Sequence, residues 1–283
     1  MIEIGVERII NQQILSRVKG NKNWLGIVCG ATGSGKSYWS LGLCERYFPN
    51  FSTDNIVFSV NEWLKRFTEL YEDKAKGEIL VFDEGEEWSA RRAMETKNVE
   101  FTNILAMIRF TQISSIFTLP DVRMIDISSR RLMHNYMYVI DVDRKSPSTP
   151  DWMRTRSGAH MYEIVRDKLP DENSKFKVKI PRIPIQIRNN TTGECYEKVV
   201  KVPKVWFNAP SDKLLDEYEQ LKNKHFGNSL TKATDRIRAA ESKSNAKEGI
   251  DPNAKSKLKA DKSHQAAMSE IMSSPSLPIP SNH

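Results

Sequence analysis

The chain has 283 residues, of which 39% are hydrophobic and 28% charged, with 43 basic against 36 acidic side chains. That length allows one large domain or two small ones with a packed core. No stretch approaches the roughly 18–20 consecutive apolar residues that span a bilayer, and Glu3, Glu7 and Arg8 interrupt the apolar pattern of the first residues. The sequence therefore predicts neither an integral membrane protein nor a secreted one. Three scattered cysteines predict no disulfide framework and no zinc site, and they favour a cytoplasmic location.

Short apolar runs alternate with amphipathic stretches through residues 1–150. The apolar runs predict strands and the stretches between them predict helices, as in an α/β domain. We expect strands at residues 24–29, 55–60, 79–83, 114–119 and 137–142, and helices at residues 38–47, 62–71 and 99–110. Because the strands are almost wholly apolar, we expect a sheet that helices cover on both faces.

A glycine-rich loop follows the first predicted strand. Its sequence, GATGSGKS at residues 30–37, fits the pattern G-x-x-x-x-G-K-[ST], in which backbone N–H groups surround phosphates at the start of a helix. Lys36 would reach the β- and γ-phosphate oxygens of ATP, and the Ser37 hydroxyl would ligate Mg²⁺. We therefore predict a site for ATP and Mg²⁺ that is formed by Gly30, Ala31, Thr32, Gly33, Ser34, Gly35, Lys36, Ser37 and Tyr38.

Two carboxylates, Asp83 and Glu84, stand at the end of the third predicted strand. Asp83 would hold the water shell of Mg²⁺, and Glu84 would act as the general base toward an attacking water. The alternative is a strand that ends in ordinary solvated acids. A second carboxylate directly after the aspartate points to water as the acceptor, and therefore to an ATPase rather than a small-molecule kinase.

Thr118 stands at the carboxyl end of the fourth predicted strand. That strand would lie beside the nucleotide, so Thr118 could contact the γ-phosphate or the attacking water, the role called a sensor. The alternative is a β-branched residue that serves only the strand.

Residues 151–226 predict a β-rich appendage that ends in a helix. Strictly alternating side chains, a turn signal and a returning strand place its strands at residues 176–180, 183–187 and 195–205. Ser211 would then cap a last helix over residues 212–224. Twelve Lys or Arg against six Asp or Glu in residues 154–204 make this appendage the expected DNA contact. The alternative is a hairpin whose cations only face solvent.

The composition changes after Phe226. Residues 227–283 contain no Phe, Trp, Tyr, Val or Cys and are rich in Ser, Lys, Ala and Asn. Such a segment buries too little apolar surface to offset its chain entropy, so we expect a disordered tail, with a transient helix around residues 231–244 as the alternative. A tail of this kind could recruit a protein partner.

The loop, the strand that ends in Asp83 and Glu84 and the strand that carries Thr118 follow one another in an order that resembles the HerA/FtsK branch of P-loop ATPases. That branch includes viral genome-packaging and zonula occludens toxin-like ATPases. The resemblance covers roughly residues 20–145 and extends to Arg109 before the sensor strand and Arg130 beyond it. It implies a RecA-like P-loop sheet covered by helices and a homo-oligomeric ring.

Ring ATPases often place an arginine in the nucleotide site of the neighbouring subunit. Arg130 is favoured here over Arg109, because Arg109 can also be explained as a cation at the end of its helix. Arg131 is a third candidate.

The leading hypothesis is an ATP-hydrolysing motor that translocates or packages DNA, of a virus or mobile element. The alternatives are an ATPase that drives virion assembly or protein secretion, and a nucleotide-dependent switch. Zonula occludens toxin-like assembly proteins usually carry a membrane segment, and the expectation that none is present here favours the DNA motor. Its place would be the host cytoplasm, or the virion if the protein is viral.

Overall fold

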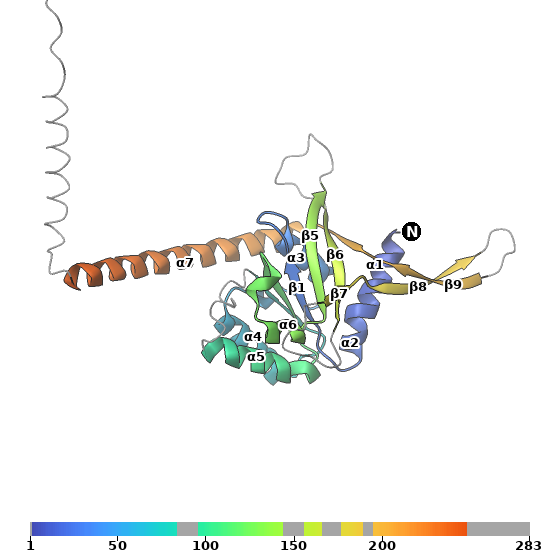
Figure 1. The fold of residues 1–283 in the computed structure, drawn as a ribbon, viewed down its shortest axis with the longest axis horizontal. Coiled ribbons are helices and arrows are strands. Elements are labelled where there is room, and N and C mark those ends of the chain that lie inside the picture. Colours follow the sequence, from blue (N-terminus) through green and yellow to red (C-terminus); the bar gives the residue numbers. More distant parts are fainter. Residues whose placement is uncertain (1, 84–95, 144–155, 166–176, 189–194, 248–283) are drawn as a thin grey trace, which may run out of the picture. The chain divides into compact units, whose positions relative to one another are not determined.

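The computed structural model describes residues 2–83, 96–143, 156–165, 177–188 and 195–247 (Figure 1). The chain divides into two compact units, Met1–Glu219 and Gln220–His283. The first unit contains every strand of the described residues and all of the residues that form the candidate site below.

Parallel strands form the centre of the main sheet, in the order β5-β1-β4-β3-β2. They are β1 (Leu25–Cys29), β2 (Ile56–Val57), β3 (Ile79–Phe82), β4 (Ser114–Leu119) and β5 (Asn135–Asp143). All residues of β1, β3 and β4 are buried, as expected for strands between two layers of helices. The predicted α/β class is confirmed.

The second strand is shorter than the predicted strand over residues 55–60. Ser59 caps helix α4, accepting a hydrogen bond from the Glu62 backbone N–H at 3.2 Å. The Glu62 carboxylate in turn accepts from the N–H of Phe58 at 2.9 Å. This reciprocal capping begins the helix at Val60 and leaves only Ile56 and Val57 in the strand.

The main sheet continues with antiparallel strands beyond β5. Strand β6 (Arg156–Val165) pairs with β5, and both β10 (Lys204–Asn208) and β7 (Lys177–Lys179) pair with β6. A separate two-stranded sheet consists of β8 (Arg182–Arg188) and β9 (Cys195–Lys201). The turn expected at residues 189–193 lies outside the described residues.

The appendage predicted for residues 151–226 is therefore wrong as a separate domain. Strands β6, β7 and β10 belong to the same sheet as the glycine-rich loop, and only β8 and β9 stand apart from it. Pro203 separates β9 from β10, which the sequence pattern joined into one strand over residues 195–205. Proline cannot donate to a strand ladder, so the chain changes sheets at this point.

Helices cover both faces of the parallel strands. Within the described residues, the helices before α7 are α1 (Ile2–Ile10), η1 (Asn11–Leu15), α2 (Ser16–Lys19), α3 (Lys36–Tyr47), η2 (Thr53–Asn55), α4 (Val60–Glu72), α5 (Thr96–Met107), η5 (Ile108–Phe110), η6 (Val122–Met124) and α6 (Ile127–Leu132). On one face, Trp63 of α4 stacks on Phe67 with ring centroids 4.9 Å apart and meets Phe101 of α5 at 5.0 Å. This core includes Leu80 and Phe82 but not their neighbours in β3, because alternate side chains of a strand point to opposite faces.

On strands β1, β3 and β4 the remaining side chains are also buried, and α3 packs against these strands and against β6 and β10. Trp39 of α3 lies 4.9 Å from Phe207 of β10, measured between ring centroids, and donates through its indole N–H to the Val205 carbonyl. A Cβ on Gly42 would lie 2.7 Å from the Asn208 carbonyl oxygen, so glycine permits this close approach of helix and strand.

The N-terminal helices α1, η1 and α2 have no counterpart among the predicted elements. Ile9, Ile10 and Ile14 are fully buried, so this segment belongs to the folded unit. Among the described residues, no helix combines the length and the apolar composition needed to cross a membrane.

The last helix, α7 (Asp212–Lys247), begins as predicted but is longer. Ser211 accepts from the N–H of Leu214 at 3.4 Å, in agreement with the predicted cap. The predicted end of this helix at residue 224 is wrong, because the helix continues to Lys247. The disorder expected from Gly227 onward is therefore also wrong for residues 227–247. One glycine costs a helix only about 1 kcal/mol, and the following alanine, lysine and glutamate residues are good helix formers. Residues 248–283 lie outside the described residues.

Candidate active site

The glycine-rich loop joins β1 to α3 with backbone angles that glycine alone adopts readily. Gly33 and Gly35 have φ angles of 77° and 88°, in the left-handed region. A Cβ on Gly30 would lie 2.6 Å from Ser34 Oγ and 2.8 Å from the Val139 carbonyl oxygen. The three glycines therefore let the loop fold over the start of α3, where the first N–H groups have no partner within the helix.

Lys36 is the first residue of α3, and its ammonium group is held against the loop. Its Nζ donates to the carbonyl oxygens of Gly30 and Ala31, at 3.0 Å each. Ser34 Oγ is buried and has no hydrogen-bond partner among the described residues. A cation, an unpaired hydroxyl and the N–H groups of a helix start thus occupy one loop. This donor set fits a phosphate chain, which accepts from all three.

A buried carboxylate lies beside the loop. Asp83 directly follows β3, is fully buried and accepts three hydroxyl hydrogen bonds. Oδ1 accepts from Ser37 Oγ at 2.8 Å and from Thr118 Oγ1 at 2.5 Å, and Oδ2 accepts from Tyr218 Oη at 2.6 Å. Burying a carboxylate is costly unless its oxygens are hydrogen-bonded, and these three donors meet that requirement.

The adjacent oxygens of Ser37 and Asp83 fit a magnesium ion. Mg²⁺ prefers hard oxygen ligands and usually keeps several waters, with only one or two protein ligands and phosphate oxygens completing its shell. No group of three or more His, Cys, Asp or Glu gathers in the part of the chain that the structure describes. Ser37 and Asp83 are therefore the residues that would hold Mg²⁺ beside a nucleotide.

Sequence reasoning missed Tyr218, the third donor to Asp83. Tyr218 lies in the second turn of α7 and is only 1% exposed, and Leu214, one turn earlier, is also buried. This i, i+4 spacing indicates that one face of the helix packs against the protein. It does not indicate that the buried face reaches a carboxylate 135 positions earlier in the chain.

The first two turns of α7 are held beside the candidate site by further hydrogen bonds. The Ser211 N–H donates to Glu45 of α3 at 2.9 Å, and Thr53 Oγ1 donates to Glu217 at 3.2 Å. Tyr38, which was predicted to contact the cofactor, donates to Glu219 at 3.2 Å. The start of α7 is therefore a built part of the site.

Replacement of Tyr218 by phenylalanine should destabilise the protein while preserving the packing of the ring. The buried Oδ2 of Asp83 would lose its donor, and a hydrogen bond to a charged group contributes about 1.5–3 kcal/mol. We expect the free energy of unfolding in urea to fall by about that amount. Tyr71→Phe is the matched control, because Tyr71 is 53% exposed and should change stability by less than about 0.5 kcal/mol. Equal stabilities for the two variants would contradict the importance of this contact.

The structure brings several predicted site residues together. Lys36, Ser37, Asp83 and Thr118 lie in one cluster. Thr118, the predicted sensor, is only 1% exposed, and its hydroxyl donates to Asp83. Glu84, the predicted general base, lies outside the described residues.

The predicted arginines lie at different places around the sheet. Arg109 is exposed in η5, and its carbonyl oxygen accepts from the N–H of Asn23, just before β1 begins. It therefore lies at the edge where the parallel strands start, away from the loop. Arg130 of α6 is half-buried and donates to the Asp126 carbonyl, and burial lowers the pKa of its guanidinium while Asp126 and Asp121 oppose that shift. Arg131 is exposed.

Cys29 is the last residue of β1 and directly precedes the loop. Burial raises the pKa of its thiol to about 12, with Asp121 raising it further and Lys36 lowering it. Only the thiolate is a strong nucleophile or metal ligand, and burial favours the protonated thiol at Cys29.

Comparison with known proteins gives one family match and several similar folds. Residues 5–136, slightly less than half of the chain, match the family "Type III restriction enzyme, res subunit". No curated protein matches the sequence. The match includes the loop, Asp83 and Thr118, and with the sheet order it agrees with the predicted RecA-like P-loop fold.

The similar solved structures share little sequence with the chain. The N-terminal domain of zonular occludens toxin from Neisseria meningitidis is 17% identical, with 52% of this chain and 87% of that chain covered and a TM-score of 0.33. The genome packaging NTPase B204 from Sulfolobus turreted icosahedral virus 2, in complex with AMPPCP, is 9% identical, with 50% and 93% covered and a TM-score of 0.32. EssC ATPases 2 and 3 from Geobacillus thermodenitrificans are 13% identical, with 49% of this chain and 37% of that chain covered and a TM-score of 0.29. Similarity at this level says nothing about substrate or partner.

Proposed function

We propose that this chain, a P-loop ATPase-type protein of RecA-like fold, hydrolyses ATP to translocate or package DNA. The observation that carries the hydrolytic part is the hydrogen bond between Ser37 of the glycine-rich loop and the buried Asp83. It joins a phosphate-binding loop to a carboxylate at the position where Mg²⁺ would bridge phosphate oxygens. The excess of twelve Lys or Arg over six Asp or Glu in residues 154–204 supports a nucleic-acid partner.

Each residue of the cluster has a distinct part in this proposal. Lys36 and the N–H groups of the loop bind the phosphate chain and neutralise its charge. Ser37 and Asp83 would hold Mg²⁺, whose positive charge would stabilise the negative charge of the phosphate chain. Thr118 and Tyr218 fix the orientation of the aspartate through their hydroxyl groups. Glu84, the next residue in the chain, accepts the proton of the attacking water.

The test is ATP turnover with and without single- and double-stranded DNA across a salt series. We expect DNA to raise turnover at low salt, with the increase declining steeply as salt rises, because binding through phosphates releases counterions. Glu84→Gln is the matched variant: it keeps the size of the side chain but removes the base, so ATP should bind and persist. Wild-type turnover in Glu84→Gln would show that the base is another group, and turnover that ignores DNA would contradict the motor. Stimulation by a protein alone would favour assembly or secretion.

We further propose that the chain forms a homo-oligomeric ring in which Arg130 of one subunit serves the nucleotide of the next. Subunits with Arg130→Ala and subunits with Glu84→Gln should each be inactive alone. When they are mixed, some interfaces will join an intact Glu84 to an intact Arg130, and turnover should return. Arg109→Ala and Arg131→Ala are tested in the same way. If subunits shown to exchange recover no activity with any of the three, the transferred arginine does not exist among them.

A further inference from the structure

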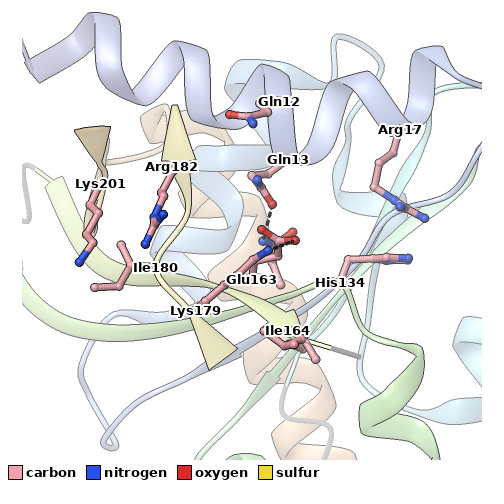
Figure 2. Close-up of a pocket in the computed structure, with 12 residues that line it drawn as sticks. Gln12, Gln13, Arg17, His134, Glu163, Ile164, Lys179, Ile180, Arg182 and Lys201 are labelled. Atoms are coloured by element: carbon pink, nitrogen blue, oxygen red, sulfur yellow. Dashed lines mark hydrogen bonds and ion pairs between the residues drawn. The ribbon is translucent and has the colours of Figure 1, made fainter. Parts of the chain in front are cut away.

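A polar pocket lies between the N-terminal helices and the strands that follow β5. Its volume is about 1090 Å³. The helical side is formed by η1 and α2 and the opposite side by β7, β8 and β9 (Figure 2). The side chains that give these walls their character are Gln12, Gln13, Arg17, Lys179, Arg182 and Lys201.

The pocket is distinct from the nucleotide loop. His134 and Asn135, which line it, stand at the start of β5, and the His134 N–H donates to the Leu25 carbonyl at the start of β1. The glycine-rich loop follows the end of β1, which is parallel to β5. The two sites therefore lie at opposite edges of the sheet and can be occupied together.

Hydrogen bonds hold the floor and walls of the pocket in place. Asn135 accepts from the indole N–H of Trp24 at 2.8 Å and donates to Gln13 at 3.2 Å. His134 Nδ1 accepts from the Leu25 N–H at 2.9 Å. Arg8 of α1 donates to the Pro184 carbonyl of β8 at 3.2 Å and so links the two walls. The pocket is preformed, which lowers the cost of ordering side chains when a ligand binds.

The cations of the pocket outnumber its carboxylates. Glu163 is paired with Lys179 at 3.2 Å. Arg182 and Lys201 are directly opposite each other in the β8–β9 register, both are exposed, and within the described ranges neither forms an ion pair. Like charges in directly opposed positions destabilise a pair of strands. A bound anion between them would turn this repulsion into attraction.

We propose that this pocket binds the backbone phosphates of a nucleic acid, an inference that rests on the DNA partner of the proposed function. Guanidinium forks and ammonium groups are the side chains that bind phosphate best, and Arg17, Arg182 and Lys201 supply them from three different elements. The pocket is slightly larger than the usual small-molecule range of about 300–1,000 Å³, and its walls are polar rather than apolar. A chain of phosphates, whose charges repeat along its length, fits these separated cations.

The test is the salt dependence of binding of a labelled 30-nucleotide single strand and of the matching duplex to the full chain. The double variant Arg182→Gln with Lys201→Gln removes two phosphate contacts. The slope of log K against log salt should therefore become shallower by about 1.4 for the single strand and about 1.8 for the duplex. The control removes two charges elsewhere: Lys76 is exposed after α4, and Lys198 points to the other side of β9 from Lys201. The slope for this control, Lys76→Gln with Lys198→Gln, should stay close to that of the wild type.

Two further measurements keep the result unambiguous. The thermal midpoint of the double variant should equal or exceed that of the wild type, because the opposed charges are gone; if it falls, Arg17→Gln replaces the double variant in the binding assay. Unlabelled polyglutamate should compete far less well than unlabelled DNA.

If the slope of the double variant equals that of the wild type, while DNA still raises the turnover of the wild type, the pocket does not bind DNA. The proposed motor function is then unaffected. A wild type that neither binds DNA nor responds to it overturns both. A third outcome is that polyglutamate competes as well as DNA in the wild type and fails to compete in the double variant. That result would identify the pocket as a site for an acidic protein and contradict the assignment to nucleic acid.

Discussion

Replacement of Lys36 by alanine should weaken nucleotide binding and reduce hydrolysis even more strongly. The Lys36 ammonium bonds directly to loop atoms, the carbonyl oxygens of Gly30 and Ala31. A hydrogen bond to a charged group contributes about 1.5–3 kcal/mol, which corresponds to a loss of about 10- to 100-fold in affinity for ATP. Hydrolysis should fall further, because charge that develops on the phosphates would no longer be neutralised.

Binding of a fluorescent ATP analogue and steady-state turnover measure these two losses separately. Lys76→Ala is the charge-matched control, since Lys76 is exposed in the turn after α4. The variant should retain its fold, because the Gly30 and Ala31 carbonyls that the Lys36 ammonium contacts belong to the loop, where water can replace that contact. Wild-type affinity in Lys36→Ala would mean that phosphates bind somewhere other than this loop.

Replacement of Asp83 by asparagine should separate nucleotide binding from magnesium binding. The amide keeps the size of the side chain but lacks the negative charge that would hold the Mg²⁺ water shell. We expect turnover with ATP and Mg²⁺ to fall by at least about a hundredfold, while binding of ATP in the presence of a chelator stays within about threefold of the wild type. Lys36→Ala, by contrast, should weaken binding under both conditions.

The same variant should also destabilise the protein. Asp83 Oδ1 and Oδ2 together accept from Ser37, Thr118 and Tyr218, and an amide nitrogen on either side would face a hydroxyl that now donates. Leaving buried donors poorly matched costs about 1–3 kcal/mol, measurable by urea unfolding. Asp54→Asn, at an exposed position in η2, removes one carboxylate without such contacts and should leave turnover and stability unchanged. Full turnover in Asp83→Asn would contradict the metal site.

The parts of the site that were predicted from sequence are those with local signals. Residues 30–37 carry their glycines, lysine and serine in one continuous pattern, and an apolar strand leads into it. Asp83 likewise directly follows four apolar residues whose burial their composition predicts. The conformation of the loop and the apolar run of the strand are both encoded in consecutive residues, so these patterns are visible in the sequence.

The parts that were not predicted depend on pairing between distant segments. Strand β10 alternates between buried and more exposed residues, but nothing in that pattern says that it pairs with β6, or that β6 in turn pairs with β5 beside the parallel strands. Tyr218 is similarly visible as a buried helix residue but not as a donor to Asp83. The predicted domain boundary at residue 150 is wrong for this reason. Strands β6, β7 and β10, which follow it, belong to the same sheet as β1 and the glycine-rich loop.

The hydrogen bond between Tyr218 and Asp83 has a consequence for the order in which the site forms during synthesis of the chain. Synthesis proceeds from the N-terminus, and domains form as their segments emerge from the ribosome. The glycine-rich loop and the aspartate emerge early, but the third donor to the carboxylate is 135 residues later in the chain. A nascent chain that ends before α7 contains the glycine-rich loop and Asp83 but lacks the Tyr218 hydroxyl that donates to this carboxylate. The third hydroxyl donor to Asp83 therefore becomes available only after β10, the last strand in the described part of the chain, has been made.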